Sequence, residues 1–225
     1  MTYVMSDLHG CYDKYRQMLE KIGFGDGDRL YILGDVIDRG AGGIDILLDK
    51  MKRKNVVPLI GNHESLALRS LKHIRDGVPE DALIKTKAYR LWMLSDGEPT
   101  AAAFRALPKE TQTALIDYIE GFSVYKMITV SGQRFHLSHT LPDYCPGQDI
   151  HNVSFLEFIW GEPDYEIEYT PDVFFITGHT PTHLIDPAYK GKIWRGNNHI
   201  AIDCGAAFGG RLGCICLDTT EEFYI

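Results

Sequence analysis

The chain has 225 residues, of which 44% are hydrophobic and 24% are charged, so it is long enough to bury one substantial core. Its 31 acidic residues against 23 basic ones give a net charge of -8, which argues against a surface for nucleic acid or for an anionic membrane. No apolar run approaches the roughly 18 to 20 residues that a membrane helix needs. We therefore expect one domain, residues 1–225, that binds neither nucleic acid nor membrane.

The number of cysteines and the start of the chain both bear on the compartment. Five cysteines form an odd set, and the chain begins without the basic and apolar regions of a secretion signal. Together these features indicate a reduced, cytoplasmic compartment. We interpret all the cysteines as small structural residues rather than a metal or redox group. They are Cys11, Cys145, Cys204, Cys214 and Cys216.

The first sixty residues alternate between short apolar runs and amphipathic segments. Apolar runs at 3–5, 30–33 and 56–60 predict strands, and the segments at 12–22 and 44–53 predict helices. Strands joined by helices form a parallel sheet, in which ligands bind beyond the carboxyl ends of the strands. The functional residues are therefore expected at those strand ends.

The rest of the chain divides into a helical part and a part that is mainly sheet. Helical spacing from residue 65 to about 121 predicts a helical insertion within the same domain. Residues between 142 and 171 are rich in Pro, Gly, Asp and Glu and predict a long loop with a helical turn near 155–160. A hairpin turn is predicted at Ser131-Gly132. Further strands are predicted at 124–130, 134–138, 173–177, 199–202 and 214–217.

Each of the first three strands is followed by a cluster of oxygen and nitrogen ligands. The clusters are Asp7-Leu8-His9-Gly10, the run from Gly34-Asp35 to Asp38-Arg39-Gly40, and Gly61-Asn62-His63-Glu64. One Asp-x-His pair is a weak signal, and either aspartate of the second cluster could simply cap backbone N–H groups. Three clusters at successive strand ends, with glycines that let a ligand approach closely, favour a metal site.

These three motifs, in this order, resemble the phosphoprotein phosphatase family of metallophosphoesterases, and most closely its small bacterial and phage branch. Further matches are Leu137-Ser138-His139, Gly178-His179-Thr180-Pro181 and Ile202-Asp203-Cys204-Gly205, so the resemblance covers nearly the whole chain. It implies an α/β, calcineurin-like metallophosphoesterase fold. Such a fold has a central β-sandwich with flanking helices, and here the helical insertion would be added to it.

The resemblance also implies a binuclear metal centre in which one carboxylate bridges two divalent ions. A set of His, Asp and Asn ligands without thiolate suits Mn, Fe, Zn or Mg, and Mn is the first expectation. The first ion would be bound by Asp7, His9 and Asp35. The second ion would be bound by Asp35, Asn62, His139 and His179.

The implied reaction is attack on phosphorus by a metal-bridging hydroxide, without a covalent enzyme intermediate. His63 would be the general acid that protonates the departing alkoxide, and Asp38 would orient it. Arg39 would bind the phosphate oxygens as a fork. The histidines that match no motif position are interpreted as structural or surface residues: His73, His136, His151, His183 and His199.

One segment departs from the family pattern. Related small phosphatases carry a Trp-x-Arg segment that is implied to supply a second phosphate-binding arginine, whereas this chain reads Trp160-Gly161-Glu162. A carboxylate cannot do that work, so either Arg195 or Arg211 substitutes or the substrate differs. For the three tryptophans, Trp92, Trp160 and Trp194, core packing is favoured over base stacking in at least two cases.

Three functions remain open at this point. The first is a serine/threonine protein phosphatase, acting on a phosphorylated protein or a small phosphoester, which the Gly-His-Thr-Pro run around His179 favours. The second is symmetrical hydrolysis of diadenosine tetraphosphate to ADP by the same metal cage. The third, ranked lower because it gives His63 and Asp38 no role, is a non-catalytic metal-binding module that recognises a phosphorylated partner. The sequence leaves the oligomeric state open.

Overall fold

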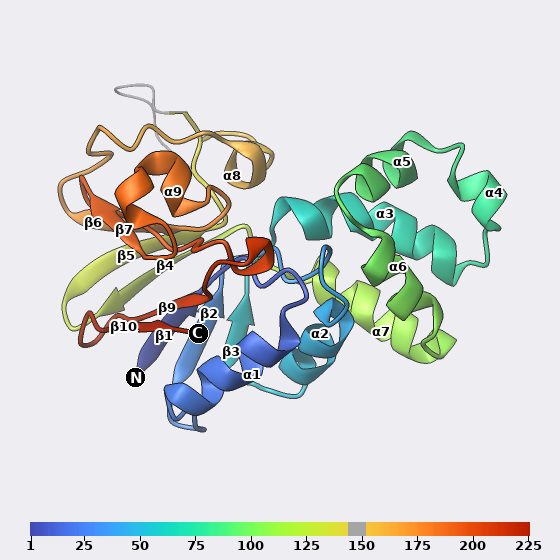
Figure 1. Cartoon of the computed structure of the whole chain (residues 1–225), viewed down its shortest axis with the longest axis horizontal. Coiled ribbons are helices and arrows are strands. Elements are labelled where there is room, and N and C mark those ends of the chain that lie inside the picture. The colour runs from blue at the N-terminus through green and yellow to red at the C-terminus, as the bar shows by residue number, and fades with distance from the viewer. Residues whose placement is uncertain (144–151) are drawn as a thin grey trace.

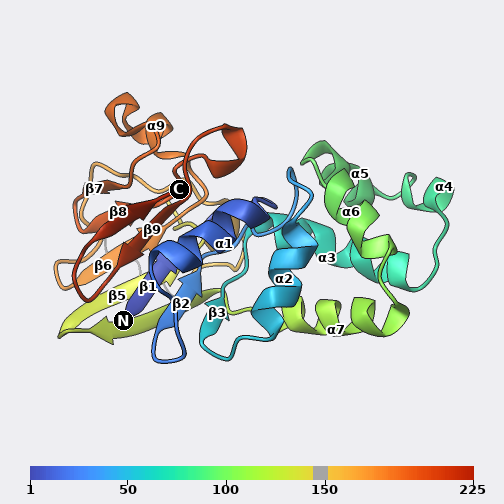
Figure 2. The ribbon, with the colours of Figure 1, turned by 60° about the horizontal axis from the view of Figure 1, so that its bottom comes forward.

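The computed structural model describes residues 1–143 and 152–225, so the interpretations of Cys145 and His151 lie outside the described residues. Two five-stranded sheets are stacked at the centre of the molecule, and a lobe of helices extends beside them (Figure 1). Helices α1 (Tyr12–Lys21) and α2 (Gly43–Met51) connect strands of the first sheet and cover its outer face (Figure 2). The predicted sandwich with flanking helices is confirmed.

The first sheet contains the predicted β-α-β-α-β unit. Strands β1, β2 and β3 are parallel, as expected for strands joined by helices, and β9 and β10 are added antiparallel at the side of β1. Strand β10 was not predicted because its three residues show no alternation. In spatial order the strands are β10 (Glu222–Tyr224), β9 (Gly213–Cys216), β1 (Thr2–Met5), β2 (Arg29–Ile32) and β3 (Val56–Pro58).

The second sheet is built by the C-terminal half of the chain. Ser131 and Gly132 have φ values of 51° and 84°, which is the twist that a two-residue hairpin needs, and the predicted turn there is confirmed. A second such turn, Asn197-Asn198, joins β7 to β8 and marks a hairpin that was not predicted. In spatial order the strands are β4 (Tyr125–Val130), β5 (Gln133–Ser138), β6 (Val173–Thr177), β8 (His199–Ala201) and β7 (Trp194–Gly196).

The strands of the first sheet read as continuous apolar runs because both of their faces are buried. In β1, Tyr3 and Met5 pack against the helices, whereas Val4 packs against the second sheet. In β9, Cys214 faces the helices and Ile215 faces the second sheet. Alternate residues therefore enter two different cores, and the carboxyl ends of the strands are held rigidly between them.

The helical insertion begins three residues earlier than predicted. Helix α3 starts at Asn62, so Asn62 and His63 lie in its first turn rather than in the loop before it. Trp92 and Phe104 of the insertion belong to the same apolar cluster as Met5, so the insertion shares a core with the first sheet. Its helices are α3 (Asn62–Arg75), α4 (Glu80–Leu83), α5 (Lys87–Leu94), α6 (Glu98–Arg105) and α7 (Lys109–Glu120).

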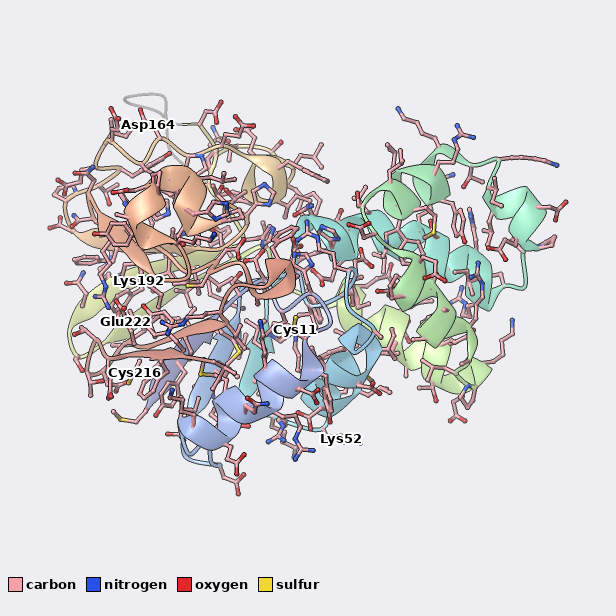
Figure 3. All side chains as sticks on the ribbon, in the orientation of Figure 1. Cys11, Lys52, Asp164, Lys192, Cys216 and Glu222 are labelled. Atoms are coloured by element: carbon pink, nitrogen blue, oxygen red, sulfur yellow. The ribbon has the colours of Figure 1, made fainter. Side chains whose placement is uncertain are left out.

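Short helices complete the long loop and the C-terminal half. Helix α8 (Glu157–Trp160) confirms the turn predicted near 155–160, and α9 (Thr182–Ile185) and the 3-10 turns η1 (Pro187–Tyr189) and η2 (Ala206–Phe208) were not predicted. No helix in the described ranges is long and apolar enough to span a membrane. The four cysteines of these ranges carry free thiols, with Cys11 just ahead of α1 and Cys216 in the first sheet (Figure 3).

A buried lysine interrupts the core between α2 and the insertion. The Lys50 side chain is almost fully buried, and its Nζ atom lies 5.1 Å from the centroid of the Phe122 ring. Within the described parts of the chain, that atom has no hydrogen-bond partner. Burial lowers the pKa of Lys50 from 10.5 to about 7, although the Glu64 carboxylate offsets part of the effect.

We expect the Lys50→Met variant to be more stable than the wild type at pH 7, by about 1 to 3 kcal/mol, because the folded state no longer buries an ammonium group. The unfolded chain holds this proton up to about pH 10.5 and the folded chain only to about pH 7. The destabilisation caused by burying the Lys50 ammonium group is therefore complete below pH 7 and disappears as the pH rises toward 10.5. Thermal unfolding at pH 7 and pH 10 measures both effects, and the exposed Lys52→Met is the control. A lower melting temperature for Lys50→Met at pH 7 would contradict this account.

Candidate functional site

The nine predicted site residues come from the carboxyl ends of five strands and meet in one region. Strands β1, β2 and β3 bring the first three motifs together, and the second sheet adds one histidine after β5 and one after β6. Almost all of these side chains are buried. The residues are Asp7, His9, Asp35, Asp38, Arg39, Asn62, His63, His139 and His179.

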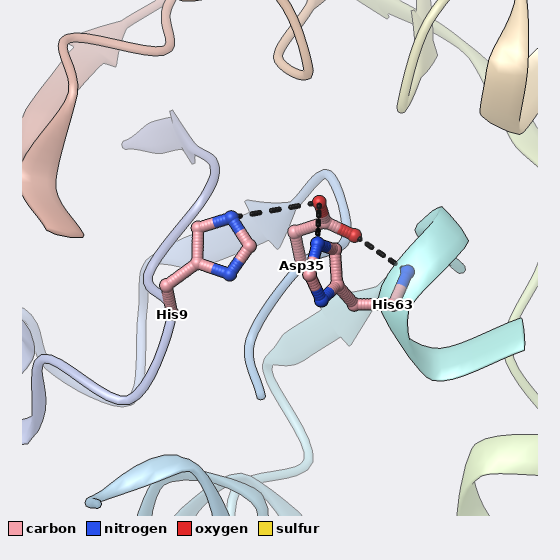
Figure 4. A group of neighbouring side chains, drawn as sticks. All are labelled: His9, Asp35 and His63. Carbon is pink, nitrogen blue, oxygen red and sulfur yellow. Dashed lines mark hydrogen bonds and ion pairs between the residues drawn. The ribbon is translucent and has the colours of Figure 1, made fainter. Parts of the chain in front are cut away.

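The Asp35 carboxylate lies at the centre of this region. Its Oδ2 atom is 3.4 Å from His139 Nε2, 3.6 Å from His9 Nε2 and 3.8 Å from His63 Nε2. Figure 4 shows His9 and His63 on either side of this carboxylate. Most of these separations are too long for hydrogen bonds. They match donor atoms that share a cation at about 2.1 Å, which lie about 3 to 4 Å from one another.

One group of donor atoms corresponds to the predicted second ion. Asn62 Oδ1 is 2.8 Å from His139 Nε2 and 3.1 Å from His179 Nδ1, and the two imidazole nitrogens are 3.1 Å apart. With the Asp35 carboxylate, the two histidines bring their donor atoms within 4.8 Å of one another. The four residues therefore offer the oxygen and nitrogen set that a divalent cation takes.

The other group differs in part from the prediction. His9 and Asp35 are joined by His63 in a set of donor atoms within 4.8 Å of one another, although His63 was predicted to be the general acid and not a ligand. Asp7 lies at the rim of this set, because its Oδ1 is 3.9 Å from His9 Nε2. Its Oδ2 accepts hydrogen bonds from Ser6 Oγ at 2.5 Å and from the His179 backbone N–H at 3.0 Å. Asp7 therefore offers one oxygen to the cluster of predicted metal ligands. This cluster, called the cage below, consists of Asp7, His9, Asp35, Asn62, His139 and His179.

Backbone carbonyls fix the orientation of two of the imidazoles. His9 Nδ1 lies 3.0 Å from the Ile37 carbonyl oxygen, and His139 Nδ1 lies 2.7 Å from that of Leu33. A carbonyl can only accept, so in both rings Nδ1 carries the proton of the neutral tautomer and Nε2 directs a lone pair into the cage. This is the arrangement of a metal-binding histidine, and the chemistry of the donor set fits divalent metal ions.

Charge in the cage is set by burial and by the central carboxylate. Burial lowers the pKa of His9 to about 3, and burial with repulsion from His139 lowers that of His179 to about 4. Burial also opposes ionisation of Asp35, but His139 and His63 hold its pKa well below the usual range. Although burial opposes its charge, the attraction of Asp35 raises the pKa of His139 to about 10. Asp35 therefore stays ionised and stabilises positive charge beside it, as it would stabilise a divalent cation.

The predicted acid and its orienting partner are in contact. His63 Nδ1 is 2.8 Å from Asp38 Oδ2, and the Trp92 indole N–H donates to both Asp38 oxygens at 3.0 Å. Burial opposes a charge on His63, but Asp35 and Asp38 outweigh it and raise its pKa. Sequence reasoning favoured core packing for at least two of the three tryptophans and missed this hydrogen bond of Trp92, because the donor and the acceptor are 54 residues apart.

Glu64 ties two of the motifs together. Its carboxylate accepts backbone N–H bonds from Asp35 at 2.9 Å, Val36 at 2.7 Å, Ile37 at 3.3 Å and Gly61 at 3.0 Å. The side chain is fully buried. It therefore fixes the loop after β2 against the start of α3 and holds Asp35 near Asn62. The residue was part of the third motif, but no role was predicted for it.

The loops that carry the ligands are closely packed, and several of their residues have left-handed backbone. Gly61 and Gly178 leave no room for a side chain, because an added Cβ would lie 2.2 Å from Asp35 Oδ1 and 2.1 Å from Asp7 Oδ2. Left-handed backbone costs a non-glycine residue on the order of 1 kcal/mol or more, and it persists where the surroundings enforce it. The site residues with φ between 41° and 69° are Asp7, His9, Asp35, Asp38, Arg39 and His179.

Arg39 reaches the cage, whereas the two arginines proposed as substitutes do not. Arg39 Nη1 is 2.5 Å from His9 Nε2, and its Nη2 is 3.4 Å from His63 Nε2. Arg195 instead pairs with Glu222, and the Arg211 guanidinium lies over the Tyr224 ring. These contacts give no support to the suggestion that Arg195 or Arg211 replaces the missing arginine. Glu162 is exposed and also offers no cation.

Comparisons with known proteins agree with this geometry. The sequence pattern of the family described as Calcineurin-like phosphoesterase matches residues 2–204. A symmetrical bis(5'-nucleosyl)-tetraphosphatase from Haemophilus ducreyi is 36% identical over 84 residues, which are 36% of this chain and only 31% of that enzyme. The asymmetrical bis(5'-nucleosyl)-tetraphosphatase PrpE from Geobacillus thermodenitrificans is 27% identical over 93% of this chain and 87% of its own.

A solved structure is similar over the whole chain. It belongs to a protein assigned as a diadenosine tetraphosphatase and covers 100% of this chain and 92% of its own, with a TM-score of 0.66 and 16% identity. At that identity the likeness shows the fold alone. The fold, the family pattern and the cage geometry therefore agree on a metal-dependent phosphoesterase.

Replacing Glu64 by glutamine is expected to destabilise the protein by about 2 to 4 kcal/mol, because four backbone N–H groups lose a charged acceptor in a buried position. It is also expected to weaken Mn²⁺ binding at least about tenfold, since Asp35 and Asn62 lose their common support. Thermal unfolding and calorimetric Mn²⁺ titration measure the two effects. Glu98→Gln, on the exposed first turn of α6, is the matched control. Equal effects from both variants would remove the role assigned to Glu64.

The Trp92→Phe variant keeps the aromatic packing but removes the only indole donor to Asp38 in the described residues. We expect a loss of about 1 to 2 kcal/mol in unfolding free energy, because a buried carboxylate loses a partner. Trp194→Phe, which alters a half-buried indole outside this network, is the control for the substitution itself. If Trp92→Phe proves no less stable than Trp194→Phe, the hydrogen bond contributes nothing to the fold.

Proposed function

The chain belongs to the calcineurin-like phosphoesterase family, and from this premise we propose that it hydrolyses phosphoanhydride bonds of dinucleoside polyphosphates with two divalent metal ions. The observation that carries this proposal is the relative that spans 93% of the chain and is named a bis(5'-nucleosyl)-tetraphosphatase. The symmetrical enzymes that match a shorter segment carry the same substrate in their name. The cage described above supplies the ligands that such chemistry requires.

One ion would be held by Asp7, His9 and Asp35, and the other by Asp35, Asn62, His139 and His179, which leaves His63 free to act as an acid. Bound divalent cations supply Lewis acidity, which makes a nucleophile from water near neutral pH and neutralises phosphoryl oxygens. Arg39 is placed to bind those oxygens as well, because its guanidinium lies against His9 and His63 at the rim of the cage. The chain therefore contributes orientation and one positive charge of its own.

His63 is the proposed general acid. Asp38 holds the imidazole by Nδ1 so that Nε2 faces the cage, and the carboxylates of Asp35 and Asp38 outweigh burial and raise its pKa, which favours the protonated form. The proton would pass from Nε2 to the oxygen that leaves phosphorus. A nucleotide phosphate is already a good leaving group, so this proton matters less for a dinucleotide than for an alkyl phosphoester.

The sequence prediction placed a serine/threonine protein phosphatase first. Its specific support is the Gly-His-Thr-Pro run around His179, and the same cage would serve it. The relatives that match this chain favour the dinucleotide instead. We therefore rank dinucleotide hydrolysis first, and the protein phosphatase stays a prediction that product analysis separates from it.

The Mn²⁺-loaded protein is expected to cleave diadenosine tetraphosphate, and chromatography identifies the products. ADP alone means symmetrical cleavage, and ATP with AMP means asymmetrical cleavage. Asp35→Asn should lower the rate at least about 100-fold, because the carboxylate shared by both ions is lost. The exposed Asp26→Asn is the control. Phosphate release from a phosphoserine peptide, without cleavage of the dinucleotide, would replace the proposed function by the protein phosphatase.

His63→Asn is expected to lower kcat by about 100-fold or more on an alkyl phosphate, and much less on an aryl phosphate, whose leaving group needs no proton. Because Trp92 acts through Asp38 and His63, adding Trp92→Phe to His63→Asn should cause little further loss. Steady-state kinetics on the two esters measure both effects. The same loss on both esters would show that His63 is not the general acid.

A further inference from the structure

Two exposed aromatic side chains flank the cage. The relative exposure of Phe208 is 63% and that of Trp160 is 45%. Single exposed apolar residues are common and need no function. Among the exposed large apolar side chains of the described residues, however, these two have rings that contact predicted site residues, namely Arg39 and His179. They approach different ends of the cage, because Arg39 touches His9 whereas His179 belongs to the group around Asn62.

The Phe208 ring continues the surface formed by the phosphate-binding arginine. Arg39 Cζ lies 4.6 Å from the ring centroid, so the guanidinium covers part of the ring. The remainder of the ring faces solvent. A planar group stacked there would lie directly beside the position at which Arg39 binds phosphate oxygens.

The turn that carries Phe208 is held in place. Lys14 Nζ donates to the carbonyl oxygens of Ala206 at 2.8 Å and Gly210 at 2.7 Å, and the Phe208 N–H donates to Gly205 at 2.9 Å. These bonds fix the turn on both sides of the ring. An aromatic ring that is held before a ligand arrives loses little conformational freedom on binding.

Trp160 forms one wall of a groove at the other end of the cage. Its ring stands edge-on to that of His179, with centroids 6.2 Å apart. The groove has a volume of about 360 Å³, and three carboxylates line it beside Trp160: Asp143, Glu157 and Glu162. Carboxylates repel phosphate but accept hydrogen bonds from amino groups. An aromatic face beside such acceptors therefore suits a planar base with an exocyclic amine, such as adenine.

We propose that Trp160 and Phe208 each stack one nucleobase of the substrate, with the polyphosphate between them across the cage. This inference rests on the proposed dinucleotide activity, because only a substrate with a base at each end would use both rings. It also gives Glu162 a role, since a carboxylate at this position favours a base amine where an arginine would bind phosphate. Stacking on an aromatic side chain tolerates different bases and is disrupted by substitution with alanine.

The test compares AMP with ribose 5-phosphate, which lacks only the base, by calorimetric titration of the Mn²⁺-loaded protein. We expect AMP to bind the wild type at least about tenfold more tightly. Phe208→Ala and Trp160→Ala together should bring the ratio of the two dissociation constants close to one. Phe208→Tyr and Trp160→Phe should each keep most of the preference for AMP over ribose 5-phosphate. Removing the Phe208 ring also removes a contact of Arg39, which would weaken the binding of AMP and of ribose 5-phosphate alike. The ratio of the two dissociation constants therefore reports recognition of the base alone.

Phe155→Ala is the matched control, because Phe155 is an exposed ring in the same segment as Trp160 but does not line the groove. Equal affinities of the wild type for AMP and ribose 5-phosphate would overturn the inference. An unchanged ratio in the double alanine variant would overturn it as well. Turnover of diadenosine tetraphosphate by the wild type is scored separately, so failure of base recognition is distinguished from failure of the proposed function.

Discussion

The structure depends on one buried carboxylate surrounded by three imidazoles. Asp35 Oδ2 faces the Nε2 atoms of His9, His63 and His139; backbone carbonyls hold the rings of His9 and His139, and the Asp38 carboxylate holds that of His63. Burying a carboxylate is costly unless positive charge is near it. In this structure protonated His139 supplies part of that positive charge, and a divalent cation would supply it in place of the proton. The fold holds these ligands in advance, so binding need not reorder them.

That preorganisation is achieved by groups that are not ligands. The Glu64 carboxylate ties the loop after β2 to the start of α3, and carbonyl groups fix the tautomers of His9 and His139. The ligand loops keep left-handed backbone at several non-glycine positions. Strain of this kind persists only where the surrounding packing is rigid, and here two apolar cores enclose the strands that carry the loops.

The helical insertion also contributes to the site, although it lies beside the sandwich. Trp92 of α5 donates to Asp38, and Thr100 of α6 accepts from the Asp38 backbone N–H at 2.8 Å. The Arg39 N–H donates to the Asp96 carbonyl between these helices at 3.0 Å. The insertion therefore positions Asp38 and Arg39, which are the proposed partner of the acid and the proposed phosphate-binding residue. At the other side of the site, Trp160 stands beside a groove lined by the carboxylates of Asp143, Glu157 and Glu162.

The sequence alone determined that the first three strands are parallel and that the three motifs meet at one edge of the sheet, because parallel strands joined by helices place their carboxyl ends together. It could also show that Glu162 departs from the family pattern. It could not show that Trp92 supports Asp38 or that Phe208 covers Arg39, since these pairs are separated by 54 and 169 positions and no local pattern links them. Nor could it show that Arg195 pairs with Glu222 and that Arg211 lies over Tyr224, since these contacts form only when the strands pack. Local periodicity encodes elements and their ends, whereas contacts between distant side chains exist only once the sheets and the insertion have packed.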